Sequence, residues 1–348
     1  MKTLHVDLGR QWRGGQNQAL LLVQGLLDRG HATELIAVLG SPLARQAQDA
    51  GIQVHAVGHP GARLQASLQV TRLLKPDTFD AVHCHDAHGL TAAWIAGAHR
   101  RAPVVASRRV AYALTRNRIA LSRYRSARKI IAVSRFVKDS VLASGLPDTQ
   151  VEVVYDGVPL PPQAPRYRRI AAPPLIGCVG YLLPEKGQEL LIRAMPLILG
   201  KNAGCRLILA GDGPSRAGLE QLARELKVGQ AIQFAGHVED VSQVYRALDV
   251  FLFPSLAEPL GSSLLAAMSH GLPVAAVAGG AVPEIVEDEG NGLLVAEPQA
   301  SAMAGAVLRL LDDPELAARL GAAGRATIEE RFTVGRMVEA TLDVYQRL

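Results

Sequence analysis

The sequence has no uninterrupted apolar run of the roughly 18–20 residues that a membrane-spanning helix needs, although 49% of its 348 residues are hydrophobic. It has only three cysteines, Cys84, Cys178 and Cys205, and no C-x-x-C pair. They lie in or beside apolar, strand-like runs, which favours buried thiols over disulfides or a metal cluster. The amino terminus also lacks a signal-peptide pattern. We therefore expect a cytoplasmic protein.

Acidic residues are missing from one long stretch, since none occurs between Asp86 and Asp139. The same stretch holds these basic residues: Arg100, Arg101, Arg108, Arg109, Arg116, Arg118, Arg123, Arg125, Arg128 and Lys129. This asymmetry indicates an anionic partner. Basic and apolar residues alternate over 116–128 as in an amphipathic helix, so residues 100–129 favour peripheral binding to an anionic membrane face. A merely solvated helix is an alternative, and nucleic acid fits less well because no reading motif accompanies the charges.

Strand-like and helix-like runs alternate along the whole chain. The pattern starts with a strand at 3–8 and a helix at 18–27, breaks in the proline-rich residues 159–174, and restarts with a strand at 175–179. Regular β-α-β alternation predicts parallel, doubly wound sheets, and a proline-rich break is typical of a linker. We therefore expect an α/β fold of two Rossmann-like domains that face each other across a cleft.

The most informative stretch is PSLAEPLGSSLLAAMSHGLPVAAVAGGAVPEI, residues 254–285. Its pattern predicts a loop with Glu258 and Gly261, a short helix at 262–269, then a strand and a second helix opened by the glycine pair at 279–280. The first N–H groups of a helix are unpaired and its dipole is positive there, so such loops bind anions, and Gly261 lets a ligand come close. Two adjacent loops of this kind suit a diphosphate.

This stretch resembles the donor-binding signature of family 4 retaining glycosyltransferases, which have the two-domain GT-B fold. In that signature, E-x-F-G precedes a helix with a second glutamate, followed by A-M-A-x-G-x-P-V and G-G-x-x-E-I. The matching residues are Glu258, Gly261, Ala267, Met268, Gly271, Pro273, Val274, Gly279, Gly280, Glu284 and Ile285. The family's second glutamate, which usually holds the ribose of the nucleotide, falls on Ala266. The resemblance implies domains at 1–160 and 161–333, with a terminal helix at 334–348 that returns to the first domain.

The resemblance continues at the start of the predicted second domain. The family motif G-R-L-x-x-x-K-G, whose arginine and lysine clamp the donor's diphosphate, matches Gly180, Lys186 and Gly187, with Tyr181 in the arginine's place. A lysine before a helix N-terminus can meet a phosphate on physical grounds too, although it can also be a solvated surface residue. The resemblance implies these donor-binding residues: Gly15, Gly180, Tyr181, Lys186, Gly213, Gly236, His237, Glu258, Pro259, Leu260, Gly261, Ser262 and Ala266.

The predicted first domain has a glycine pair at 14–15 after its first strand and a histidine-rich strand end. Glycines there allow close approach to phosphate or sugar. Strand alternation places His83 and His85 on one face, at the edge where such sheets bind ligands. The family has a histidine here that reaches the donor sugar, and His85 matches it. The alternatives are core or capping histidines, or a metal site formed with Asp86 and His88.

The next predicted strand ends in Ser107-Arg108-Arg109, and such arginines suit an acceptor phosphate or acidic sugar. Arg109 can equally begin a basic surface helix. The residues expected at the acceptor are Gly14, Gln16, Arg108 and Arg109. The sequence contains no D-x-D motif for a divalent metal on the donor, so we expect a GT-B enzyme that uses no metal or other cofactor.

The resemblance implies a retaining hexosyltransferase that uses a nucleotide-diphosphate sugar. Its acceptor would be a glycan or lipid-linked molecule in lipopolysaccharide or other cell-envelope polysaccharide synthesis, at the cytoplasmic membrane face. The catalytic residues would be His85, Glu258 and Lys186: Lys186 and helix N-termini stabilise the leaving diphosphate, Glu258 holds sugar hydroxyls, and His85 contacts the sugar. Attack from the leaving-group side needs no enzymic nucleophile. The alternative, favoured by Tyr181 and Ala266, is a GT-B-shaped protein that binds a glycan or nucleotide without transferring sugar.

Overall fold

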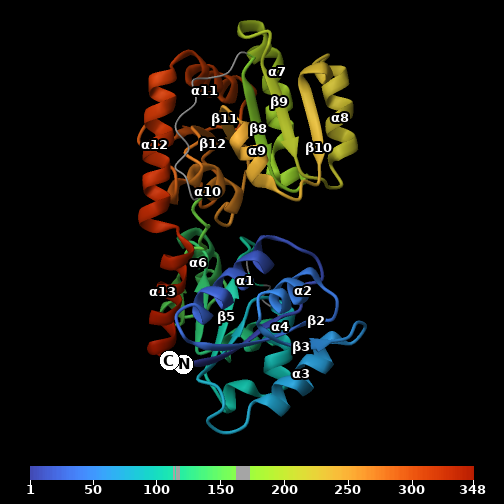
Figure 1. Cartoon of the computed structure of the whole chain (residues 1–348), viewed down its shortest axis with the longest axis vertical. Helices are drawn as coiled ribbons and strands as arrows, with labels where there is room; N and C mark the ends of the chain where they lie inside the picture. The colour runs from blue at the N-terminus through green and yellow to red at the C-terminus, as the bar shows by residue number, and fades with distance from the viewer. Residues whose placement is uncertain (113, 115–117, 162–172) are drawn as a thin grey trace. The chain divides into compact units, whose positions relative to one another are not determined.

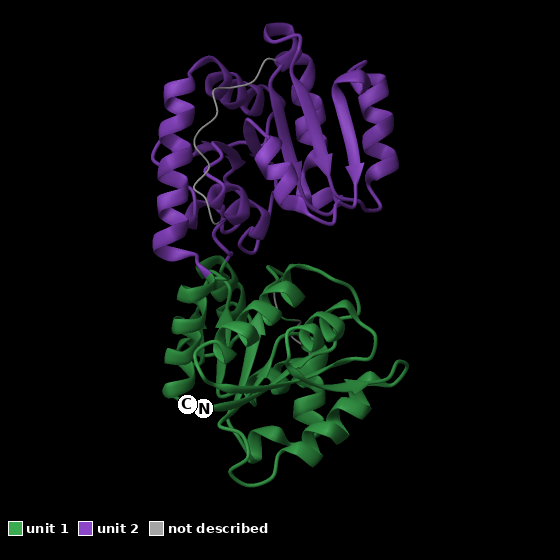
Figure 2. Ribbon diagram, viewed as in Figure 1, with its two compact units in different colours: residues 1–157, 334–348 green, residues 158–333 purple. Residues whose placement is uncertain are grey.

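The computed structural model describes residues 1–112, 114, 118–161 and 173–348, which form two compact units (Figure 2). Unit 1 comprises Met1–Gly157 and Val334–Leu348, and unit 2 comprises Val158–Thr333. Most of the predicted linker, residues 162–172, lies outside the described residues, as does Arg116 of the predicted basic helix.

Unit 1 is built on a seven-stranded sheet with the order β3-β2-β1-β4-β5-β6-β7, in which every pair of neighbours is parallel. Helices connect the strands, as Figure 1 shows. The strands are β1 (Lys2–Asp7), β2 (Ala32–Val38), β3 (Gln53–Val57), β4 (Ala81–Cys84), β5 (Val104–Arg108), β6 (Lys129–Ala132) and β7 (Val151–Val153). The helices are α1 (Gly14–Leu27), α2 (Pro42–Asp49), α3 (Ala62–Leu73), α4 (Ala87–Ile95), α5 (Arg118–Arg125), α6 (Arg135–Leu142) and α13 (Val334–Gln346).

The central strands of unit 1 are buried on both faces, which explains their short, almost continuous apolar runs. In β4 and β5 every residue is buried. The last helix, α13, packs on α1, and a Cβ added at Gly25 would lie 2.6 Å from Cγ2 of Val338. Glycine at this position therefore lets two helices from opposite ends of the chain approach closely.

Unit 2 is built on a six-stranded parallel sheet with the order β10-β9-β8-β11-β12-β13. Its core joins apolar side chains of the strands to those of α7, α11 and α12. The strands are β8 (Leu175–Val179), β9 (Arg206–Ala210), β10 (Ile232–Gly236), β11 (Val250–Phe253), β12 (Val274–Val277) and β13 (Leu293–Val295). The helices are α7 (Gln188–Lys201), α8 (Arg216–Glu225), α9 (Val241–Ala247), α10 (Ser262–Ser269), α11 (Ala300–Asp312) and α12 (Pro314–Arg331).

Two local predictions need correction. The helix expected after the glycine pair at 279–280 is a single 3-10 turn, Val282–Glu284. Glu289 takes a left-handed backbone conformation (φ 59°) and Asp288 bridges Gly292, so the chain turns back before a second helical turn can form. The glycine pair at 14–15 opens α1 instead of preceding it. No helix in the described ranges combines the length and apolar character needed to cross a membrane.

Candidate active site

Most residues predicted to bind the donor gather along one edge of the sheet in unit 2, whereas Gly15 lies in unit 1, in the first turn of α1. All six strands run parallel, so the loops after their carboxyl ends share that edge. The residues placed there are Gly180 and Tyr181 after β8, Gly213 after β9, Gly236 and His237 at the end of β10, Glu258 to Gly261 between β11 and α10, and Ser262 at the start of α10. Ala266 lies one turn further along α10, half-buried.

Lys186 and Glu258, predicted separately, form an ion pair with a distance of 2.6 Å between Nζ and Oε2. Glu258 is buried, and the hydroxyl of Ser255 donates a second hydrogen bond to the same carboxylate oxygen. The lysine side chain remains 31% exposed. Lys186 ends the 3-10 turn Pro184–Lys186 just before α7, so its ammonium group keeps protons for a ligand while Glu258 fixes its position.

Gly187 and Gly280 allow neighbouring loops at this edge to pack closely against each other. Gly280 has φ 61°, and a Cβ there would lie 2.2 Å from the carbonyl oxygen of Glu258. Gly187 has φ 70°, and a Cβ there would lie 2.2 Å from the carbonyl oxygen of Pro254. The amide of Ala281 also donates to the Glu258 carbonyl, at 2.9 Å. Only glycine tolerates such a backbone approach with positive φ, so these two residues hold the loop that carries Glu258.

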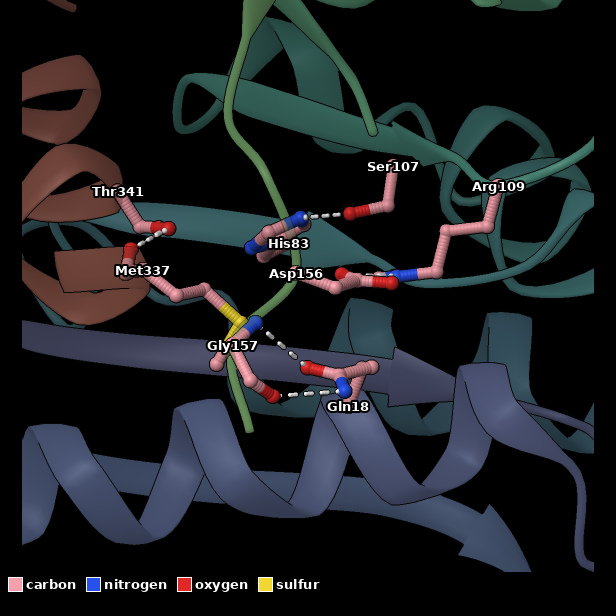
Figure 3. A network of polar contacts seen from close by, with 8 residues as sticks. All are labelled: Gln18, His83, Ser107, Arg109, Asp156, Gly157, Met337 and Thr341. Carbon is pink, nitrogen blue, oxygen red and sulfur yellow. Dashed lines mark hydrogen bonds and ion pairs between the residues drawn. The ribbon is translucent and has the colours of Figure 1, made fainter. Parts of the chain in front are cut away.

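In unit 1, the corresponding edge is a cluster of charged and polar side chains (Figure 3). Nε of Arg109 lies 2.9 Å from Oδ1 of Asp156, and both side chains are largely buried. Asp7, at the end of β1, accepts hydrogen bonds from the Gly9 amide at 2.8 Å and from Gln16 at 3.1 Å. Gln16 and Arg109, both predicted at the acceptor, therefore each contact a buried carboxylate, and the charge of Arg109 also acts on Asp7.

Burial shifts the ionisation of these carboxyl groups. Burial raises the pKa of Asp7 to about 6, and the neighbouring carboxyl of Asp86 adds to the shift, while hydrogen bonds from Gly9 and Gln16 and the charge of Arg109 oppose it. Burial also raises the pKa of Asp156, against the lowering effect of Arg109. In each case desolvation of the carboxylate is the largest cause.

The two arginines predicted at the acceptor have different surroundings. Arg108 is buried, its guanidinium lies 4.7 Å from the ring centroid of Tyr112, and it donates to the carbonyl of that residue. Nη1 of Arg109 is buried and has no hydrogen-bond partner in the described part of the chain. Nε of Arg108 is likewise buried without a partner among the described residues, so each arginine keeps one unpaired donor, although Arg108 is the more tightly held by its own loop.

Three histidines, His5, His83 and His85, stack in a buried cluster, and each offers one ring nitrogen within 4.8 Å of the others. These groups could hold a metal ion by spacing alone. Nδ1 and Nε2 of His83 instead lie 2.6 Å from the Tyr345 hydroxyl and 2.8 Å from the Ser107 hydroxyl. The described contacts occupy five of the six ring nitrogens, all but Nδ1 of His85, so the cluster fits a hydrogen-bond network better than a metal site.

The metal site considered from the sequence combined His83 and His85 with Asp86 and His88 in place of His5. Oδ1 of Asp86 accepts hydrogen bonds from the amides of Gly89 at 2.7 Å and Leu8 at 3.3 Å, which caps α4. His88 is exposed on α4. His5, which joins the cluster in their place, gave no signal in the sequence because it lies inside a strand that looks purely structural.

Two family models match the chain, one to each part. The model described as Glycosyltransferase Family 4 matches residues 12–160, and the model described as Glycosyl transferases group 1 matches residues 164–327. The chain belongs to the family 4 glycosyltransferases of the GT-B type. It is therefore an enzyme that transfers glycosyl groups.

Individual proteins agree with this assignment. The glycosyltransferase MJ1607 of Methanocaldococcus jannaschii is 29% identical, and the match covers 93% of this chain and 92% of the relative. The lipopolysaccharide core biosynthesis glycosyltransferase LpsE of Rhizobium meliloti is 32% identical over 50% of this chain, which spans about half (49%) of LpsE. Alr3699/HepE of Anabaena, solved with UDP and glucose, superimposes with a TM-score of 0.86 over 100% of both chains at 19% identity, which supports the GT-B fold.

Proposed function

We propose that this glycosyltransferase moves a hexosyl group, with retention of configuration, from a nucleotide-diphosphate sugar to a glycan or lipid-linked acceptor of the cell envelope, such as lipopolysaccharide. The name of LpsE supports the acceptor class, and the UDP and glucose bound to Alr3699/HepE support the donor class. The observation that carries the proposal is the Lys186–Glu258 pair beside the amino terminus of α10.

The chemistry follows from the charges at this edge. A leaving diphosphate gains negative charge in the transition state, and the Lys186 ammonium together with the unpaired N–H groups of α10 stabilises that charge. Gly261, which precedes α10 with φ 110°, provides no side-chain cap that would compete for those N–H groups. Glu258 fixes the position of Lys186 through their ion pair, and it also accepts hydrogen bonds from hydroxyl groups of the sugar. We propose that the reaction uses no metal, since these groups supply the positive charge.

A thermal-shift screen against UDP, GDP and ADP and their hexose conjugates, with CMP as a nucleotide that lacks the diphosphate, tests the donor class. We expect one nucleotide and its sugar to stabilise the protein selectively. Turnover of that sugar, followed by NMR of the anomeric proton of the product, then tests retention. An inverted product would contradict the proposed stereochemistry, and stabilisation by none of these ligands would contradict the donor assignment.

The alternative of binding without transfer is not adopted, because the chain belongs to a family of enzymes, but the two departures from the family motif bear on donor binding. Tyr181 supplies no charge where the family has an arginine, and Ala266 supplies no carboxylate for the ribose. Each missing contact is worth on the order of 1.5–3 kcal/mol when a charged group is involved, which weakens donor binding without abolishing it.

Attachment to an anionic membrane face is part of the proposal. A groove of about 870 Å³ in unit 1 is lined by Arg100, Arg101, Arg125, Arg128, Lys129 and Arg347. It lies at the amino ends of β5 and β6, the edge opposite Arg108 and Arg109, so the basic stretch divides into two sets. On α5, Leu121 and Tyr124 are buried whereas Ile119 is 63% exposed, so most of the apolar face predicted for the membrane packs into the core. The attraction that remains is mainly electrostatic.

Sedimentation with phosphatidylglycerol vesicles tests this attachment. Arg100, Arg125 and Arg128 are exposed, and reversing all three to glutamate should reduce binding at least 100-fold, at about 1 kcal/mol per basic residue. The matched control reverses three exposed arginines elsewhere, Arg63, Arg206 and Arg224. Equal binding by both triple variants, or equal binding to phosphatidylcholine, would contradict attachment through this groove.

A further inference from the structure

A hydrogen-bond chain inside unit 1 ends at His85, the residue predicted to contact the donor sugar. Thr3 and His5 lie on β1, and His85 follows the adjacent strand β4. Oγ1 of Thr3 is 2.9 Å from Nε2 of His5, and Nδ1 of His5 is 2.9 Å from Nε2 of His85. The three residues are 1%, 0% and 6% exposed. Water is therefore kept away from the inner part of the chain.

The imidazole rings in this chain are uncharged at neutral pH. Burial lowers the pKa of His5 to about 3 and lowers the pKa of His85 well below its usual value, with His83, His5 and Arg109 adding to the shift at His85. A neutral imidazole has one N–H donor and one acceptor nitrogen. Once the position of one proton is known, the donor and the acceptor of each hydrogen bond in this series are therefore determined.

The direction of the hydrogen bonds follows from the protons available at Thr3, the first residue of the hydrogen-bond chain. The Thr3 hydroxyl has His5 as its side-chain hydrogen-bond partner in the described structure. If His5 donated to Thr3, the buried hydroxyl proton of Thr3 would have no acceptor, which is costly. The hydroxyl therefore donates to Nε2 of His5, and Nδ1–H of His5 then donates to Nε2 of His85. The proton of His85 must lie on Nδ1, which is buried and has no partner among the described residues.

We propose that His5 is a positioning residue that holds the proton of His85 on Nδ1, so that this atom donates a hydrogen bond to an oxygen of the bound hexosyl group. The identity of the ligand rests on the proposed function, while the position of the proton does not. The ring nitrogen that carries the proton of a histidine is set by the hydrogen bond made at the other nitrogen. Without His5, His85 would populate both tautomers and lose its fixed orientation.

The proton position is measured directly by long-range ¹H–¹⁵N NMR of protein labelled at histidine, with His85→Gln used to assign the signal. In the wild type, we expect a protonated Nδ1 and an unprotonated Nε2 for His85. His5→Phe should give averaged shifts of both nitrogens. A proton on Nε2 of His85 in the wild type, or an unchanged tautomer in His5→Phe, would overturn the proposal even if no sugar substrate were found.

Kinetics separate positioning from mere stability. His5→Phe should lower kcat about tenfold and Thr3→Val about threefold, the scale of one lost hydrogen bond. In His5→Asn the amide can still donate to Nε2 of His85 and should restore most of the rate. Thr341→Val is the matched control, because Thr341 is equally buried in unit 1 but its hydroxyl donates to the Met337 carbonyl (Figure 3). Equal losses in Thr3→Val and Thr341→Val, or no rescue by His5→Asn, would contradict the positioning role.

Discussion

In both sheets, the loops that follow the carboxyl ends of the parallel strands form the edge at which such folds bind ligands. The two edges are nevertheless built differently. In unit 2 the edge consists of loops held by backbone contacts at Gly187 and Gly280, with one ion pair between Lys186 and Glu258. In unit 1 the edge consists of buried titratable side chains whose pKa values are shifted by burial. Under the proposed function, the first design presents N–H groups and one lysine to the donor phosphate, and the second orients side chains toward the sugar or the acceptor.

The largest effect is expected at the ion pair of unit 2. Glu258→Ala should lower kcat/KM by about 100- to 1,000-fold, because it removes the group that fixes Lys186 against the leaving charge. Glu258→Gln keeps the side-chain volume and should give an intermediate loss. The exposed Glu287→Gln serves as the control and should leave the rate unchanged. Steady-state kinetics check the series, and an active Glu258→Ala would show that this edge does not depend on the pair.

The next largest effect is expected at Gly280 and tests whether close backbone contacts hold the Glu258 loop of unit 2. Gly280→Ala should destabilise the protein by about 2–4 kcal/mol, since the new Cβ meets the Glu258 carbonyl and the residue has positive φ. Gly305→Ala, in α11, adds a Cβ that would meet no atom within 4 Å, so it should be neutral or stabilising by about 0.5–1 kcal/mol. Urea denaturation followed by circular dichroism measures both. Similar stability of the two variants would contradict the close loop packing.

A smaller, pH-dependent effect is expected in unit 1. A raised pKa means that folded Asp7 binds its proton more tightly than the unfolded chain does, so ionisation of Asp7 costs stability as the pH rises from about 4 to 6. Asp7→Asn removes this cost and should gain about 2 kcal/mol relative to the wild type between pH 4 and pH 7. Urea denaturation at several pH values checks this. The exposed Asp49→Asn should show no such trend, and a flat difference for Asp7→Asn would refute the burial argument.

The smallest effect is expected at Tyr181, which stands where the family motif has an arginine. Tyr181 is 48% exposed at the donor edge, so Tyr181→Arg can add a charge without disturbing the core. We expect a three- to tenfold increase in nucleotide-diphosphate affinity, roughly the scale of a solvent-exposed charge pair, which is smaller than that of a buried charged hydrogen bond. Tyr181→Phe is the control and should bind as the wild type does. Titration calorimetry measures both, and unchanged affinity in Tyr181→Arg would remove the support for aligning this position with the family's arginine.

The strand and helix alternation could be predicted because buried parallel strands are short apolar runs. Lys186, Glu258 and His85 could be predicted as site candidates because each follows a strand of such a sheet. The ion pair between Lys186 and Glu258 could not, since the two residues are 72 positions apart and either could have faced solvent. His5 was missed for a similar reason: its partner is 80 positions away, on the adjacent strand.

The most direct test of the account is calorimetric titration of the nucleotide diphosphate selected by the screen into three proteins: wild type, Lys186→Ala and Lys201→Ala. Lys201 is an exposed lysine at the other end of α7 and serves as the control. We predict that Lys186→Ala weakens binding about 10- to 100-fold, the cost of one charged contact to phosphate, and that Lys201→Ala binds like the wild type. Equal affinities in all three proteins would contradict placement of the donor diphosphate at this edge.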